Sequence, residues 1–237
     1  MTKALVLSGG GMFGAWQAGV WRALAPVFQP DLVVGASVGA LNGWAIAGGV
    51  APEELIEWWR TPEIGVFARL PETIQTLMER YPLKISYATV LTDSLRAKPA
   101  IFENGEVTWQ HLAASCAIPF VLPQYRIKGR WYTDGGLLNP LPVWAAVQLG
   151  ATDIVAVHPI WPKPAALMKP LVGAFVALLG HHPQVPKGVN VATLGTPSLG
   201  TLHDALHWKR ENIEKWIELG YQAARAFVDT QAETFQG

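Results

Sequence analysis

Ser37 stands in the stretch Gly35-Ala36-Ser37-Val38-Gly39, which has the spacing Gly-x-Ser-x-Gly. A serine hydroxyl in this pattern can act as a nucleophile when it projects from a sharp turn between a strand and a helix. The two glycines keep the neighbouring turns free of side chains that would clash. The apolar residues 32–34 predict the strand, and the small residues after Val38 predict the helix. The positive end of that helix would favour negative charge at the hydroxyl, as acyl transfer requires.

The stretch 8–14 reads SGGGMFG, so that Gly9, Gly11 and Gly14 spell G-x-G-x-x-G. That pattern can hold the pyrophosphate of a dinucleotide, but such a fold places an acidic residue at the end of its second strand. Here Asp31 precedes the second predicted strand. The loop is therefore interpreted as an oxyanion hole. It would open beside Ser37 and offer the backbone N–H groups of Gly9, Gly10, Gly11 and Met12.

The residue that would accept the proton of Ser37 is less apparent in the sequence. Six histidines are candidates for a Ser-His-Asp triad, and none has a telling context: His111, His158, His181, His182, His203 and His207. Asp134 instead ends a predicted hairpin strand and precedes two glycines, which would place a carboxylate on a tight turn. From the local pattern alone, an equally good interpretation is that Asp134-Gly135 forms a simple turn without a catalytic role.

Three pieces occur in order along the chain: GGGMFG, GASVG and DGG. Between the last two, residues 113–143 contain A-S-x-A-x-P and D-G-G-x-x-N-x-x-P, with Ser115, Pro119, Asn139 and Pro142 at the named positions. The chain thus resembles the patatin-like phospholipase family of serine lipid acyl hydrolases over most of its length. The ordered match is specific, whereas any single motif would not be.

The resemblance implies a Ser–Asp dyad that works without histidine. We expect no metal and no other cofactor. Ser37 would be the nucleophile, Asp134 the base, and the loop from Gly9 to Met12 the oxyanion hole. The remaining motif glycines are Gly14, Gly35, Gly39, Gly135 and Gly136. Phe13 stands where many family members carry lysine or arginine, which puts a preference for anionic phospholipids in doubt.

Apolar stretches that alternate with helical patterns predict an α/β fold. We expect a three-layer sandwich with a mostly parallel central sheet and helices on both faces, in a single domain spanning 1–237. Strands are expected at 3–7, 32–34, 84–91, 152–157 and 189–194, with a hairpin turning at Lys128-Gly129. Helices are expected at 13–27, 52–60, 71–80, 108–116, 141–149 and 202–230.

The composition of the chain limits the kinds of partner that the protein is expected to bind. Eighteen Lys and Arg balance eighteen Asp and Glu, and no basic run offers a nucleic-acid site. Cys116 is the single cysteine, which is compatible with a reducing compartment, and no signal peptide is recognisable. We therefore expect a cytoplasmic protein whose partner is a lipid or acyl-ester substrate. A peripheral contact with a membrane and the oligomeric state stay open.

Two further features carry alternative interpretations. The apolar stretch 164–180, centred on Leu167–Leu179, suits a core helix, a mobile flap over the site or a membrane contact. His203 and His207 are spaced like zinc ligands on a helix, but no third ligand is apparent. Two other functions remain: an α/β-hydrolase esterase with a histidine triad, and a catalytically silent lipid-binding protein.

Overall fold

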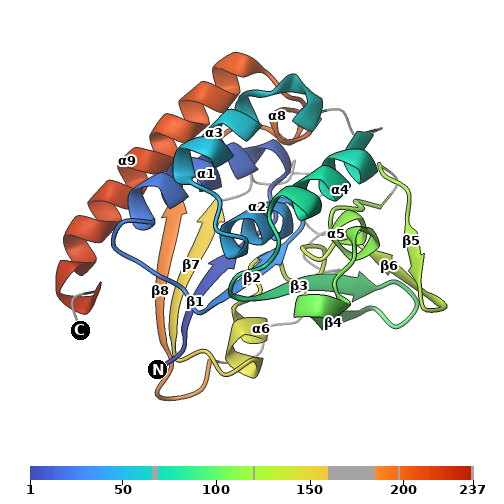
Figure 1. The fold of residues 1–237 in the computed structure, drawn as a ribbon, viewed down its shortest axis with the longest axis horizontal. Coiled ribbons are helices and arrows are strands. Elements are labelled where there is room, and N and C mark those ends of the chain that lie inside the picture. The colour runs from blue at the N-terminus through green and yellow to red at the C-terminus, as the bar shows by residue number, and fades with distance from the viewer. Residues whose placement is uncertain (66–68, 120, 160–184, 197, 236–237) are drawn as a thin grey trace, which may run out of the picture.

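The computed structural model describes residues 1–65, 69–119, 121–159, 185–196 and 198–235. Its centre is one sheet with the strand order β5-β6-β3-β2-β1-β7-β8, and β4 pairs with β3 (Figure 1). Five strands run parallel: β1 (Lys3–Leu7), β2 (Leu32–Ala36), β3 (Ser86–Asp93), β7 (Asp153–Pro159) and β8 (Asn190–Thr196). Three antiparallel strands extend the sheet beside β3: β4 (Lys98–Glu103), β5 (Tyr125–Ile127) and β6 (Arg130–Thr133).

The sheet is covered on both faces, which confirms the predicted α/β class. Alternate residues of β1 face opposite ways: Leu5 and Leu7 join the larger core, whereas Ala4 and Val6 join the smaller one. The short helix α6 (Val143–Gln148) packs on the smaller core. The larger core lies under the other principal helices: α1 (Gly14–Leu24), α2 (Val38–Ala47), α3 (Pro52–Arg60), α4 (Leu70–Arg80), α5 (Trp109–Ser115) and α9 (Arg210–Phe235).

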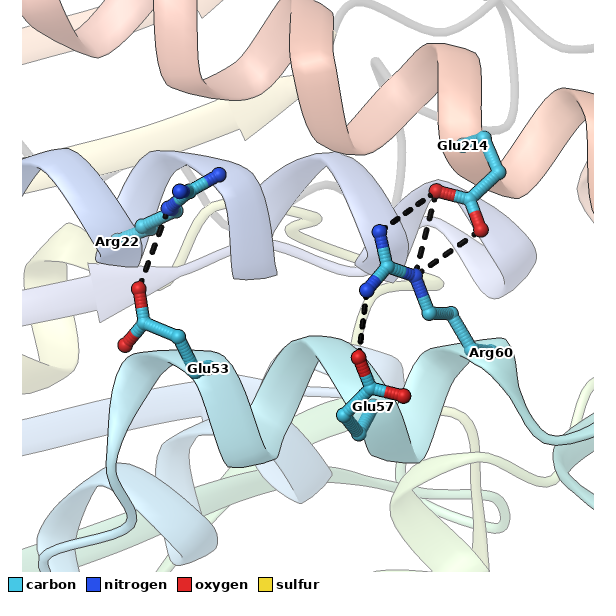
Figure 2. Close-up of polar contacts among 5 residues, drawn as sticks. All are labelled: Arg22, Glu53, Glu57, Arg60 and Glu214. Carbon is cyan, nitrogen blue, oxygen red and sulfur yellow. Dashed lines mark hydrogen bonds and ion pairs between the residues drawn. The ribbon is translucent and has the colours of Figure 1, made fainter.

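Helix α1 lies between α3 and α9, and all of its residues except Arg22 are buried (Figure 1). Glycines make the contact with α9 close: a Cβ added at Gly19 would lie 2.0 Å from the carbonyl oxygen of Ile217. Figure 2 shows how α3 is joined to α9, since the guanidinium of Arg60 contacts both carboxylate oxygens of Glu214 and also Glu57. These half-exposed ion pairs orient the helices, whereas burial of the apolar faces supplies most of the stability.

The structure differs from the sequence-based expectation in two elements. The expected helix 202–230 is two helices, α8 (Leu202–Leu206) and α9, because the backbone at His207 is extended and the indole N–H of Trp208 donates to the carbonyl of Trp59. Strand β4 was not expected; Pro99 lies within it, and it forms a half-buried edge. The stretch 164–180, including Leu167–Leu179, lies outside the described residues.

Candidate active site

Ser37 lies at the sharp turn between β2 and α2, where the sequence predicts it. Its backbone has φ 54° and ψ −130°, a conformation that costs a residue other than glycine about 1–3 kcal/mol. The glycines on either side are required by packing: a Cβ on Gly35 would lie 2.2 Å from the carbonyl oxygen of Gly39, and one on Gly39 would lie 2.4 Å from that of Leu7. Ser37 is buried, with 7% of the surface of the residue exposed.

The strained turn is held by Ser115, which lies at the end of α5. The backbone N–H of Ser37 donates to the Ser115 hydroxyl at 2.9 Å, and that hydroxyl donates to the carbonyl of Val90 at 2.9 Å. Ser115 therefore ties the turn after β2 to the neighbouring strand β3. The sequence identified Ser115 only as a motif position, because no local pattern shows a hydrogen bond across 78 residues.

Asp134 follows β6 and reaches Ser37 because of the sheet register. Thr133 pairs with Thr92 of β3, and Gly135, two residues later, packs against the carbonyl of Val90 in the same strand. Val90 in turn pairs with Ala36 of β2, the residue before Ser37. The segment after α5 fixes this turn: the N–H of Asp134 donates to the carbonyl of Ala117 at 3.1 Å. Asp134 is thus brought beside Ser37 from a position almost one hundred residues later in the chain.

The Asp134 carboxyl group is buried and contacts the Ser37 hydroxyl. Burial raises its pKa to about 6, while the hydrogen bond from Ser37 and that from the N–H of Gly136, at 2.8 Å, act in the opposite direction. Desolvation disfavours the carboxylate more than the two donors favour it. A carboxyl group in this state is ionised near neutral pH and can still accept a proton.

The glycine loop passes beside Ser37, because β1 and β2 are adjacent and parallel. A Cβ added at Gly9 would lie 3.2 Å from the Ser37 Cβ. However, the N–H of Gly9 donates to the carbonyl of Pro140 at 3.0 Å, so this predicted donor is already paired. Among the described residues, the N–H groups of Gly10, Gly11 and Met12 donate to no backbone carbonyl. Gly11 and Met12 line a pocket together with Ser37.

Two of the loop glycines are needed for close packing. Gly11 has φ 55°, and a Cβ there would lie 2.2 Å from the carbonyl oxygen of Ala205 in α8. A Cβ on Gly14 would lie 2.4 Å from both Trp59 and Val38. Likewise, a Cβ on Gly135 would lie 1.8 Å from the carbonyl oxygen of Val90, and Gly136 supplies the N–H that binds Asp134. The motif glycines therefore allow the segments around Ser37 to approach one another.

The described histidines lie away from this constellation. Two pockets contain Ser37, and none of His111, His158, His203 and His207 lines either of them. The rings of His203 and His207 stack on each other, with centroids 4.0 Å apart. The described residues contain no cluster of three or more His, Cys, Asp or Glu that could hold a metal ion. His181 and His182 lie outside the described residues.

Comparison with known proteins gives the family. The model of the patatin-like phospholipase family matches residues 5–97 and 82–147, ranges that include the glycine loop, Ser37 and Asp134. The chain belongs to the patatin-like phospholipase family. The predicted resemblance is thereby confirmed.

The relatives of this patatin-like chain include long proteins. An uncharacterised NTE family protein of Mycobacterium tuberculosis is 28% identical over 176 residues, which cover 65% of this chain and 48% of the relative. The human patatin-like phospholipase domain-containing protein 6 is 26% identical over 181 residues, covering 66% of this chain and 13% of that protein. Thus the matched region spans about half or less of these relatives.

A solved structure supports the fold. The crystal structure of VipD from Legionella pneumophila superposes with a TM-score of 0.59 at 14% identity, over 97% of this chain and 67% of that one. At this identity the likeness concerns the fold alone. In this patatin-like chain, Phe13 is buried and meets Trp216 of α9 edge-on at 5.0 Å between ring centroids. An apolar contact thus occupies the position at which many family members carry lysine or arginine. Within the described ranges, no helix is long and apolar enough to cross a membrane.

Proposed function

We propose that the protein is a serine acyl hydrolase that cleaves carboxylic esters of lipids. The observation that carries the proposal is the contact between Ser37, on its strained turn, and the buried Asp134 carboxyl group. The family supports a lipid acyl ester as the substrate class. The apolar pockets at Ser37 support the same class, since they are lined mainly by apolar side chains.

In the proposed reaction the Ser37 hydroxyl attacks the ester carbonyl while Asp134 accepts its proton. The negative charge that develops on the carbonyl oxygen would be stabilised by the N–H groups of Gly11 and Met12, with Gly10 as a further donor. Asp134 then returns the proton to the departing alcohol. A water molecule, activated by Asp134, hydrolyses the acyl group from Ser37. Direct contact between Ser37 and Asp134 removes the need for a histidine between them.

The pH dependence of turnover tests the role of Asp134. Because burial raises the pKa of Asp134 to about 6, we expect kcat/KM to fall below about pH 6 as the base becomes protonated. The profile should be measured with a p-nitrophenyl ester, which does not itself titrate in this range, and circular dichroism should establish that the fold persists. A flat profile down to about pH 4 in folded protein would exclude Asp134 as the base.

The Ser115 hydroxyl is expected to affect turnover indirectly, because it holds Ser37 in position. Ser115→Ala leaves the buried N–H of Ser37 and the carbonyl of Val90 without this partner, so we expect kcat to fall about 10–100-fold with little change in KM. Tyr87→Phe is a matched control, because the Tyr87 hydroxyl is also buried but donates to the carbonyl of Ala40 within α2. Equal losses of activity in the two variants would contradict a positioning role for Ser115.

A further inference from the structure

Two pockets meet at Ser37 and share only Gly11, Ser37, Ile118 and Leu206 among their described lining residues. The first extends between α2, α3 and α4 and is here called the α3–α4 chamber; its distinguishing residues are Leu41, Trp58, Trp59, Leu70 and Thr73. The second is called the Asp134 pocket; its distinguishing residues are Asp134, Gly136, Leu137, Pro140 and Leu202. An ester bound at Ser37 has two parts, an acyl chain and an alcohol portion, and the two pockets offer a separate space for each.

The α3–α4 chamber presents an almost entirely apolar surface. The indole N–H of Trp59 donates to the Asn42 side chain at 2.9 Å, so the polar atom of this ring is already paired within the core. Leu41 is buried on α2, and Trp58 meets Trp59 edge-on. An acyl chain would replace water against carbon atoms here, which is favourable at about 25 cal/mol for each Å² of apolar surface buried.

The position of Asp134 decides which pocket holds which part of the ester. When the tetrahedral intermediate collapses, the bond between the carbonyl carbon and the alcohol oxygen breaks, and that oxygen receives the proton that Asp134 took from Ser37. The departing oxygen must therefore face Asp134. Asp134 lines the second pocket and not the α3–α4 chamber.

We infer that the α3–α4 chamber binds the acyl chain and that the Asp134 pocket binds the alcohol portion, which carries no net negative charge. Asp134 is the sole ionisable side chain among the described residues lining the Asp134 pocket, and the described lining of neither pocket includes a lysine or an arginine. An anionic alcohol portion would meet a carboxylate there without a compensating cation. This inference rests on the proposed acyl hydrolase function and names its substrate class: esters of extended acyl chains whose alcohol portion carries no net negative charge.

Thr73 provides a test of the acyl assignment. It is half-buried on α4 and lines the chamber, whereas Thr76 is exposed one turn later and lines neither pocket at Ser37. Thr73→Trp would fill the chamber. We expect kcat/KM for p-nitrophenyl laurate to fall at least about 10-fold relative to the acetate ester, whereas Thr76→Trp should leave that ratio unchanged. If Thr73→Trp does not fold, Thr73→Leu adds less volume and is interpreted in the same way.

The Asp134 pocket is tested by a variant that should change the preference for the alcohol portion and not the preference for acyl-chain length. Leu137→Trp should leave the ratio of laurate to acetate hydrolysis unchanged, but it should lower kcat/KM for octanoylglycerol relative to methyl octanoate about 10-fold. Wild-type protein should prefer octanoylglycerol to the phosphate monoester of the same compound by a similar factor. Preference for the phosphate ester would overturn the charge assignment.

The outcomes separate this inference from the function on which it rests. If the wild type hydrolyses no ester of any chain length, the proposed function fails. If it hydrolyses esters but Thr73→Trp lowers turnover equally for acetate and laurate, the acyl assignment fails and the hydrolase remains. If Leu137→Trp instead changes the chain-length ratio and Thr73→Trp changes the alcohol preference, the two assignments are reversed.

Discussion

Ser37→Ala is expected to lower kcat/KM for p-nitrophenyl esters by about 10⁴-fold or more, because no covalent acyl intermediate can form without the hydroxyl. The backbone N–H of residue 37 keeps its bond to Ser115, so the variant should fold. Thermal unfolding and circular dichroism are the checks on folding. Ser198→Ala is the control, since the Ser198 hydroxyl is exposed and donates only to the carbonyl of Gly200.

A Ser37→Ala variant that is folded and still active would contradict the nucleophile assignment. In that case the histidine substitutions should be examined next, because a Ser-His-Asp triad requires that one His→Ala change abolish turnover. A wild-type protein that binds lipid without turnover would instead favour a silent lipid-binding protein.

Asp134→Asn should also abolish ester hydrolysis, with a loss of about 10³-fold or more, because an amide cannot accept the proton of Ser37. The substitution preserves the shape of the side chain and an oxygen that can accept the N–H of Gly136. Turnover by the folded variant should be measured on the same ester as the wild type. Intact mass after the assay guards against deamidation of the new side chain, which precedes Gly135 and would regenerate aspartate.

The same variant should be more stable than the wild type at neutral pH. The pKa of Asp134 is about 6 in the folded protein and 3.8 for an ordinary aspartate, so the folded state loses stability as pH rises from about 4 to about 6 and the carboxyl ionises. The shift of roughly two pH units corresponds to about 3 kcal/mol. Urea unfolding should show the advantage of Asp134→Asn growing from below about 1 kcal/mol near pH 4 to about 3 kcal/mol near pH 7.5. An advantage independent of pH would contradict a raised pKa at Asp134.

Much of the site could be predicted because its determinants are local. The turn at Ser37 is specified by the two glycines around it, and the parallel pairing of β1 with β2 follows from the strand–loop–helix pattern, so the glycine loop was expected beside it. The role of Asp134 could not be predicted from local determinants in the same way. Its own pattern was equally that of a simple turn, and the family resemblance, not the local chemistry, singled it out.

The remaining features depend on contacts that are distant in sequence. The carbonyl of Pro140 accepts a hydrogen bond from the N–H of Gly9, and no property of the glycine stretch reveals this partner. Leu202 and Leu206 of α8 line the Asp134 pocket, and α8 is separated from α9 although the helical pattern of 202–230 continues through the break. Thr73 likewise carries no signal in the sequence, because its relation to Ser37 exists only once α4 packs beside α2.

Labelling with a fluorophosphonate tests the nucleophile most directly, because the tetrahedral phosphorus adduct resembles the intermediate of acyl transfer. The protein should be titrated with the reagent while esterase activity and intact mass are followed together, and the adduct should then be located by peptide mapping. We predict one phosphonyl group for each chain, on Ser37, with activity lost in proportion to labelling, and no adduct in Ser37→Ala. An adduct on another residue that accounts for the lost activity, or full activity after complete labelling of Ser37, would contradict the proposal.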